Sequence, residues 1–156
     1  TIGNKLINAR SETVADKPSF RQPIRYHRCL IPASGFIEWL RQADGSRQPY
    51  YIQRKDGELL AMAGIWDTWK GSDQVIASCT ILTTAANSLV ATLHDRMPVL
   101  LSTSEYDQWL DRDITDPQQL KGIYTPYPAE PLQATPISSL INNPRHDSPD
   151  CLASVS

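Results

Sequence analysis

The chain has 156 residues, of which 40% are hydrophobic and 21% are charged, and its net charge is −2. This length and balance are typical of one ordered domain, here expected over residues 1–156. No apolar run approaches the ~20 residues of a membrane helix, and the first residues lack the apolar stretch of a secretory signal. The composition therefore argues against a membrane or secreted protein.

The charge distribution and the cysteines indicate which partners the protein can bind and in which compartment it occurs. Residues 1–55 carry ten lysines and arginines against four acids, whereas residues 56–156 carry five against thirteen. A basic half of this kind forms a phosphate-binding face or is merely a solvated surface, and charge alone leaves both open. Cys29, Cys79 and Cys151 are too few and too scattered for a disulfide framework or a metal site. Free thiols favour the cytoplasm, and the first two are interpreted as core thiols.

The first half of the chain predicts a sheet. An apolar run over residues 28–40 is interrupted by Pro32 and by Ser34 and Gly35, which predicts two short strands or a bulge. Asp-Gly turns separate the strands that follow. Further strands are expected over 49–54, 59–69 and 75–83, with 59–69 buried. We expect an α+β fold whose sheet is mostly antiparallel.

Helices are expected in the second half of the chain. The pattern Ser102-x-x-Glu105 is a capping box, and in the helix that it opens Tyr106, Trp109 and Leu110 are expected to point inward. Helices are predicted over 85–93, 102–110 and 117–122, a strand over 97–101, and an extended loop with four prolines over 125–136.

Glu38 lies between Ile37 and Trp39 in a predicted strand. Because side chains alternate along a strand, Ile37 and Trp39 share one face and Glu38 lies on the other. An exposed carboxylate is the simplest interpretation. If its face is covered, burial raises its pKa, and Glu38 can then act as a general acid or base.

His94 follows a predicted helix and precedes Asp95 and Arg96. The C-terminus of a helix favours the protonated imidazole, which suits a proton donor. The alternative is an ordinary hydrogen-bonded histidine, with Asp95 and Arg96 paired to each other on the surface.

Several polar and aromatic residues are suited to a nucleic acid. Asn8 and Arg10 lie two residues apart, and arginine binds phosphate through two parallel hydrogen bonds, while asparagine donates to a substrate oxygen. Thr83 and Thr84 lie between strand and helix, where hydroxyls hold phosphate, although Thr84 also suits an ordinary N-cap. Trp39 is the best candidate for base stacking, although the tryptophans are core candidates first.

Six segments, taken together in order and spacing, resemble one known family. They are Asn8–Thr13, Cys29–Trp39, Pro49–Ile52, Ala63–Trp66, Thr83–Asn87 and His94–Pro98. The resemblance is to the SRAP (SOS response-associated peptidase) family, whose members sense abasic sites in single-stranded DNA. It covers about residues 6–152 and implies a sheet curled into a barrel-like core with a few flanking helices.

The resemblance also implies a chemistry. An N-terminal cysteine, exposed by removal of the initiator Met, condenses through its amine and thiol with the ring-opened aldehyde of the abasic site. The thiazolidine ring that forms is a DNA–protein crosslink, and no metal or organic cofactor takes part. By resemblance, Asn8 positions the cysteine and sugar, Glu38 is the acid/base, and His94 donates a proton to the sugar oxygen. Arg10 contacts a phosphate, and Thr83 and Arg96 lie near the lesion.

One part of the family pattern is absent, because the Cys-Gly-Arg-Phe-like start is not found and the chain begins at Thr1. We therefore expect this polypeptide alone not to form the heat-stable crosslink. We also expect that the edge left by the missing segment allows self-association. The resemblance places the protein in the bacterial cytoplasm, at the nucleoid, with abasic single-stranded DNA as its partner.

Three functions are open at this point. The first is an abasic-site enzyme in which the amide, carboxylate, imidazole and guanidinium converge on one cationic cleft. The second is a non-catalytic module for single-stranded DNA on the same fold. The third is a cysteine peptidase, which rests only on the family's name, since Cys29 has no neighbour arranged to lower its pKa.

Overall fold

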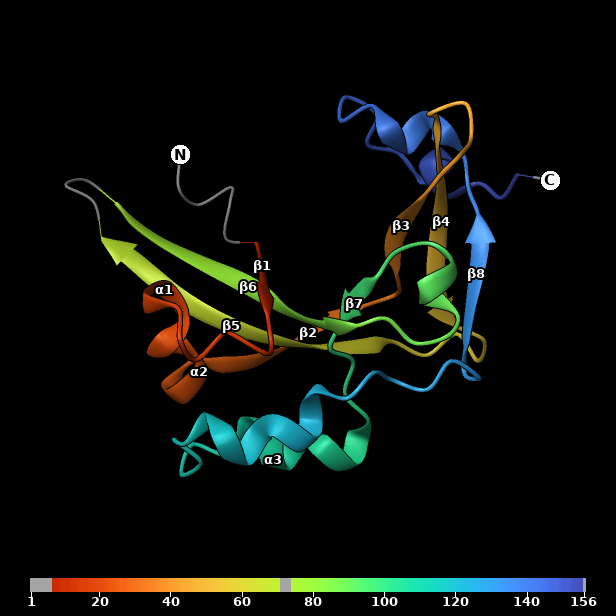
Figure 1. Ribbon diagram of the computed structural model, residues 1–156. Coiled ribbons are helices and arrows are strands. Elements are labelled where there is room, and N and C mark those ends of the chain that lie inside the picture. Colours follow the sequence, from red (N-terminus) through yellow and green to blue (C-terminus); the bar gives the residue numbers. More distant parts are fainter. Residues whose placement is uncertain (1–6, 71–73, 156) are drawn as a thin grey trace. The chain divides into compact units, whose positions relative to one another are not determined.

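The computed structural model describes residues 7–70 and 74–155 (Figure 1). The chain divides into two compact units, each built from three separate stretches of sequence. Unit 1 comprises Thr1–Pro32, Ala61–Ala85 and Pro98–Tyr127, and unit 2 comprises Ala33–Leu60, Ala86–Met97 and Pro128–Ser156. The single domain expected over residues 1–156 stays a prediction.

Unit 1 is built on a mixed sheet in which four strands run in the order β1-β6-β5-β2. Strand β1 pairs in parallel with β6, and β5 pairs antiparallel with β6 to form the long ribbon in Figure 1. The predicted strands over 28–40, 59–69 and 75–83 are confirmed. Strand β1 and its parallel pairing with β6 were not predicted from the sequence. The strands are β1 (Asn8–Arg10), β2 (Arg28–Ala33), β5 (Leu60–Lys70) and β6 (Val75–Ala85).

The ribbon of β5 and β6 extends past the core, which corrects two expectations. Only the first half of β5 is buried, and from Trp66 onward it is exposed. Cys79, expected as a core thiol, is exposed because it lies opposite Trp66 at the start of this outer part. The reason is that the antiparallel pairing continues as far as Lys70 and Val75, and the side chains of this outer part of both strands are exposed.

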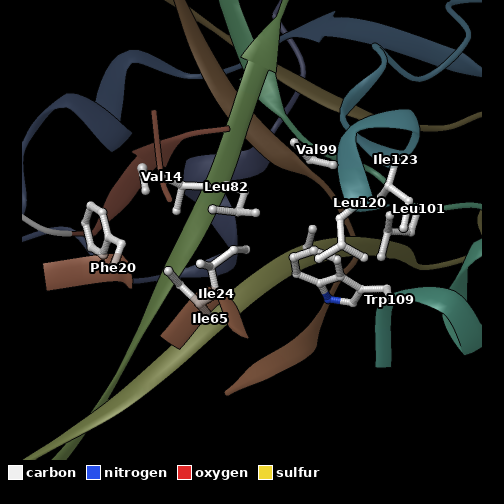
Figure 2. Close-up of a cluster of buried hydrophobic side chains, with 12 residues drawn as sticks. Val14, Phe20, Ile24, Ile65, Leu82, Val99, Leu101, Trp109, Leu120 and Ile123 are labelled. Carbon is white, nitrogen blue, oxygen red and sulfur yellow. The ribbon is translucent and has the colours of Figure 1, made fainter. Parts of the chain in front are cut away.

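The hydrophobic core of unit 1 is a cluster of twelve buried residues (Figure 2). Helix α3 (Tyr106–Leu110) contributes Trp109, which is fully buried and whose indole Nε1 donates to the carbonyl oxygen of Cys29 at 2.8 Å. Leu110, expected inward, is instead 43% exposed. Neighbouring helical residues point about 100° apart, so a short helix that buries Trp109 turns Leu110 toward solvent.

Unit 2 is built on an antiparallel sheet with the strand order β3-β4-β8. Strand β3 (Phe36–Arg41) and strand β4 (Arg47–Arg54) confirm the predicted pair, and the turn between them contains Gly45 with a φ of +85°. The last part of the predicted proline loop instead forms β8 (Leu132–Pro136). Pairing with β4 makes these residues a strand. Its one proline, Pro136, is tolerated because an edge strand needs fewer N–H donors.

The helices differ from the prediction where tertiary contacts replace local ones. Residues 85–93 do not form the expected helix; only η2 (Val90–Thr92) is helical, with a 3₁₀ turn whose Val90 N–H donates to Asn87 Oδ1. The capping box is confirmed and opens η3 (Thr103–Glu105) before α3. The predicted strand over 97–101 shortens to β7 (Arg96–Pro98), which carries the chain from unit 2 to unit 1. The remaining helical turns are α1 (Pro18–Arg21), α2 (Pro23–Tyr26), η4 (Pro117–Tyr124), η5 (Ser139–Asn142) and η6 (Pro149–Leu152).

The architecture is thus α+β, which confirms the predicted class: the described residues form a mixed sheet, an antiparallel sheet and three short α-helices. No closed barrel is found among residues 7–70 and 74–155, so the barrel-like curvature stays a prediction. No helix in the described part of the chain is long and apolar enough to cross a membrane.

Candidate active site

Glu38 lies on the covered face of the unit 2 sheet. It is paired with Tyr50 across β3 and β4, two residues from the pair Phe36 and Ile52, and Ile52 is fully buried. The Glu38 side chain is only 20% exposed. This partial burial raises the pKa of the Glu38 carboxyl above its ordinary value, because a charged carboxylate loses hydration there. The condition for the functional interpretation, a covered face, is therefore met.

His94 lies beside Glu38, although 56 residues separate them in the sequence. Its Nδ1 is 4.0 Å from Glu38 Oε2, and its side chain is 48% exposed. Asp95 Oδ1 lies 3.4 Å from the same nitrogen, so Asp95 lies beside His94. The His94 imidazole opposes the rise in the Glu38 pKa, whereas the Asp95 carboxylate adds to it.

Local backbone groups hold the His94 ring. The N–H of Arg96 is 3.1 Å from Nδ1 and can donate to it when that nitrogen carries no proton. The carbonyl oxygen of Arg96, 3.2 Å away, can accept from Nδ1 when the ring is protonated. Nδ1 of His94 therefore has a hydrogen-bond partner whether or not it carries a proton. The helix C-terminus that was expected before His94 is not formed, and the three-residue η2 turn takes its place. The backbone N–H of His94 donates to the carbonyl oxygen of Val90 in this turn.

Gly35 allows the close approach that places the strand of Glu38. A Cβ at residue 35 would lie 2.5 Å from the carbonyl oxygen of Ile52 and equally close to the ring of Tyr51. The Tyr51 hydroxyl donates to Ser34 Oγ at 2.9 Å, which holds the ring in position. Because one of these neighbours is backbone, the strand itself must move to admit a methyl group.

We expect Gly35→Ala to lower the free energy of unfolding by ~1–3 kcal/mol, the usual cost of overpacking. Urea titration monitored by circular dichroism measures this change. The matched control is Gly122→Ala, since a Cβ there meets nothing within 4 Å. Equal effects of the two substitutions would contradict the prediction.

Asn8, Arg10 and Thr83 lie together in unit 1. The parallel register pairs Arg10 with Thr83 and Asn8 with Ile81. Asn8 and Arg10 are exposed on either side of the buried Ala9, and the Thr83 hydroxyl donates to the Ala9 carbonyl at 3.4 Å. An exposed guanidinium and amide on one strand, beside a hydroxyl on the next, suit a phosphate and its sugar.

Thr84 has a structural role that differs from the two considered. Its side chain is buried, and its hydroxyl donates to the carbonyl oxygen of Tyr124 at 2.5 Å. Strand β6 continues to Ala85, so no helix begins at Thr84 and the N-cap interpretation is wrong.

Trp39 lies on the opposite face of the sheet from Glu38, as the alternation predicted. It is 37% exposed, and its Nε1 donates to Asn142 Oδ1 at 2.7 Å. Asn142 belongs to η5 and gave no signal in the sequence, because a single asparagine far along the chain carries no periodicity or motif.

The structure thus brings Glu38 together with His94, and separately brings Asn8 and Arg10 together with Thr83. The two groups belong to unit 2 and unit 1 respectively, and their convergence on one cleft stays a prediction. No cluster of three or more His, Cys, Asp or Glu that could hold a metal ion occurs among the described residues.

Comparison with known proteins assigns the family. Residues 1–144 match the family described as SOS response associated peptidase (SRAP). The chain belongs to the SRAP family. It is 42% identical over 154 residues to the abasic site processing protein YoqW of Bacillus subtilis, a match covering 98% of this chain and 69% of YoqW. The SRAP resemblance noted in the sequence is confirmed.

More distant relatives and solved structures support the same family assignment. The chain is 34% identical over 175 residues to the abasic site processing protein HMCES of Gallus gallus, covering 97% of this chain and 51% of that relative. Among solved structures, a protein from Bacteroides thetaiotaomicron matches with a TM-score of 0.88 and 31% identity, covering 98% of this chain and 67% of the other. A protein from Bordetella bronchiseptica matches with a TM-score of 0.75 and 31% identity, covering 84% and 64%.

Proposed function

We propose that this SRAP protein processes abasic sites in single-stranded DNA and that Glu38 and His94 move the protons of that reaction. The observation that carries the proposal is the proximity of a half-buried carboxyl and an imidazole, 4.0 Å apart, with the pKa of Glu38 raised. Groups whose pKa values are shifted toward the working pH are typical of general acid–base catalysis.

The proposed reaction condenses an aminothiol with the aldehyde of the ring-opened abasic sugar. His94 donates a proton from Nε2 to the ring oxygen as the C1′–O4′ bond breaks, and Glu38 takes the proton of the C1′ hydroxyl, which leaves the aldehyde. The amine nitrogen then attacks the aldehyde carbon, and Glu38 returns its proton to the carbonyl oxygen, which becomes a hydroxyl. Glu38 next takes one proton from the nitrogen and passes it to that hydroxyl, so that water leaves. His94 takes the second nitrogen proton, and a neutral imine remains. The thiol sulfur adds to the imine carbon while its proton passes to nitrogen, which closes the thiazolidine.

Substrate binding is assigned to the groups of the unit 1 sheet edge and to Arg96. Arg10 and Arg96 would contact phosphates, Thr83 a flanking phosphate or sugar, and Asn8 the aminothiol and sugar. These contacts are largely independent of base sequence, which suits a site defined by a missing base. The protons move between side chains and substrate, so the proposed steps require neither a metal nor an organic cofactor.

The aminothiol is the N-terminal cysteine by resemblance to the family, and that cysteine is not among these 156 residues. The test therefore supplies free cysteine as the amine and thiol. A single-stranded oligonucleotide with one abasic site is incubated with cysteine, with and without the protein. Captured sites resist alkaline strand cleavage on a denaturing gel.

We expect the protein to accelerate capture by free cysteine and, without cysteine, to leave no heat-stable shifted band. Protein that binds the oligonucleotide without accelerating capture would support the alternative, a non-catalytic single-stranded DNA-binding module. A heat-stable band formed without cysteine would overturn the assignment of the nucleophile.

Two further proposals concern the location of the protein in the cell and its self-association. We propose that the protein acts in the bacterial cytoplasm, at the nucleoid, as its match to a Bacillus protein supports. We also propose self-association through the exposed apolar part of β5 and β6, where Trp69 is 63% exposed and Val75 and Ile76 are also exposed. Light scattering on the same preparation tests it, and a strictly monomeric mass would contradict it.

A further inference from the structure

Three exposed side chains share the face of the unit 2 sheet that points away from Glu38. Trp39 and Arg41 lie two residues apart on β3, about 7 Å along the strand, and therefore on the same face. Arg47 is paired directly with Arg41 across the hairpin, so its side chain lies on this face as well. We name this set, Trp39, Arg41 and Arg47, the hairpin platform.

The two arginines of the hairpin platform are exposed, and no acidic side chain pairs with them in the described part of the chain. Like charges directly opposite each other across a sheet are destabilising. Within the described part of the chain, neither guanidinium has an ion pair or a side-chain hydrogen bond. The acid of the intervening turn, Asp44, accepts instead from the backbone and hydroxyl of Ser46. An anion seated between the two guanidinium groups would relieve their repulsion.

The indole of Trp39 is held in place for contact with a flat ligand. Its single polar atom, Nε1, is committed to Asn142 Oδ1 at 2.7 Å, and Asn142 Nδ2 donates to the carbonyl oxygen of Arg47 at 3.2 Å. Asn142 thus ties the indole to the strand that carries Arg47. Fixing the ring before binding reduces the entropy lost when a base stacks on it.

We propose that the hairpin platform is a second nucleic-acid contact, at which a base of the single strand stacks on Trp39 and its neighbouring phosphates bind Arg41 and Arg47. The combination of a stacking ring with flanking cations is typical of single-strand binding without sequence preference. Because Trp39 and Glu38 lie on opposite faces of β3, the nucleotide on Trp39 is not the one whose sugar meets Glu38. The ligand is therefore undamaged strand, at a distance from the lesion. This inference rests on the proposed function for its class of ligand.

The test uses an undamaged, fluorescein-labelled single-stranded oligonucleotide, which lacks an abasic sugar and so reports only on binding. Fluorescence anisotropy is measured at several salt concentrations for the wild type and for the double variant Arg41→Ser, Arg47→Ser. We expect weaker binding and a salt slope, log Kobs against log salt, that is less negative by about 1.4, or ~0.7 for each lost phosphate contact. The matched control is Arg21→Ser, Arg112→Ser, which removes the same charge from exposed arginines of unit 1.

A second pair of variants separates stacking from charge. Trp39→Leu is expected to weaken binding on the order of tenfold, as loss of one stacked base does, with the salt slope unchanged. Asn142→Ala, which keeps the indole but frees its N–H, is expected to cause a smaller loss, again with an unchanged slope. Circular dichroism and thermal unfolding establish that each variant is folded.

Equal losses in the double variant and its charge-matched control would overturn the proposal, as would unchanged binding in the double variant. Displacement of the oligonucleotide by a polyglutamate peptide at lower concentration than by unlabelled oligonucleotide would also overturn it, in favour of an acidic protein partner. None of these outcomes touches the proposed function, which is read from capture of the abasic site by cysteine.

Discussion

Replacement of Glu38 by glutamine is expected to slow the cysteine capture of an abasic site by about 100-fold or more, the usual contribution of a general acid–base group. Glutamine keeps the size and hydrogen-bonding reach of the side chain but neither takes nor gives a proton. The measurement is the initial rate of alkali-resistant product at saturating protein. Glu58→Gln is the matched control, because Glu58 is an exposed glutamate in the turn after β4.

The pH dependence gives a second readout for the same variant. The pKa of Glu38 is raised, so the folded protein binds this proton more tightly than the unfolded chain does. As the pH rises from the ordinary value near 4.5 through the folded pKa, ionising Glu38 lowers the free energy of unfolding, and the loss is complete above the folded pKa. Glutamine does not ionise, so the variant should lack this loss.

At neutral pH the Glu38→Gln variant should therefore be at least as stable as the wild type, and its lost activity cannot be attributed to unfolding. The inflection that Glu38 ionisation produces in the pH–rate profile of the wild type, above the ordinary glutamate range, should also be absent. A variant that retains the wild-type rate would remove Glu38 from the mechanism. A variant with wild-type pH dependence of stability would show that this carboxyl is not the group whose burial matters.

Replacement of Trp109 by alanine is expected to lower the free energy of unfolding by ~3–5 kcal/mol, the usual cost of truncating a fully buried aromatic residue. Trp109 is 0% exposed and belongs to the core of unit 1 (Figure 2). Its ring packs edge-on against Tyr124 at a centroid distance of 6.5 Å, and the Arg28 guanidinium lies 5.7 Å from its centroid. A large part of the usual 5–15 kcal/mol of domain stability would be lost.

Two further variants provide stability losses with which that of Trp109→Ala can be compared. Trp109→Phe keeps most of the apolar ring but removes the N–H that donates to the Cys29 carbonyl at 2.8 Å, so an intermediate loss of ~1–3 kcal/mol is expected. Trp69→Ala truncates an indole that is 63% exposed and should change stability little. Urea unfolding followed by far-UV circular dichroism measures all three, and similar losses for Trp109→Ala and Trp69→Ala would contradict the assignment of the core.

Local chemistry in the sequence was enough to predict the features that depend on neighbouring residues. Period-2 alternation set Glu38 and Trp39 on opposite faces, Asp44-Gly45 predicted the turn between β3 and β4, and Ser102 with Glu105 predicted a capped helix start. The resemblance of six ordered segments identified the family. Each of these signals is written within a few residues or in their spacing.

Features that depend on contacts between distant residues were decided by the tertiary structure. Residues 85–93 have helical character, but β6 continues through Ala85, while residues 132–136, the last part of the predicted proline loop, became strand β8 because β4 offered them an edge. The approach of His94 to Glu38, and of Asn142 to Trp39, joins segments separated by 56 and 103 residues. Such pairs form because burying a sheet face and satisfying its polar groups outweighs local preference, and no window of sequence contains both partners.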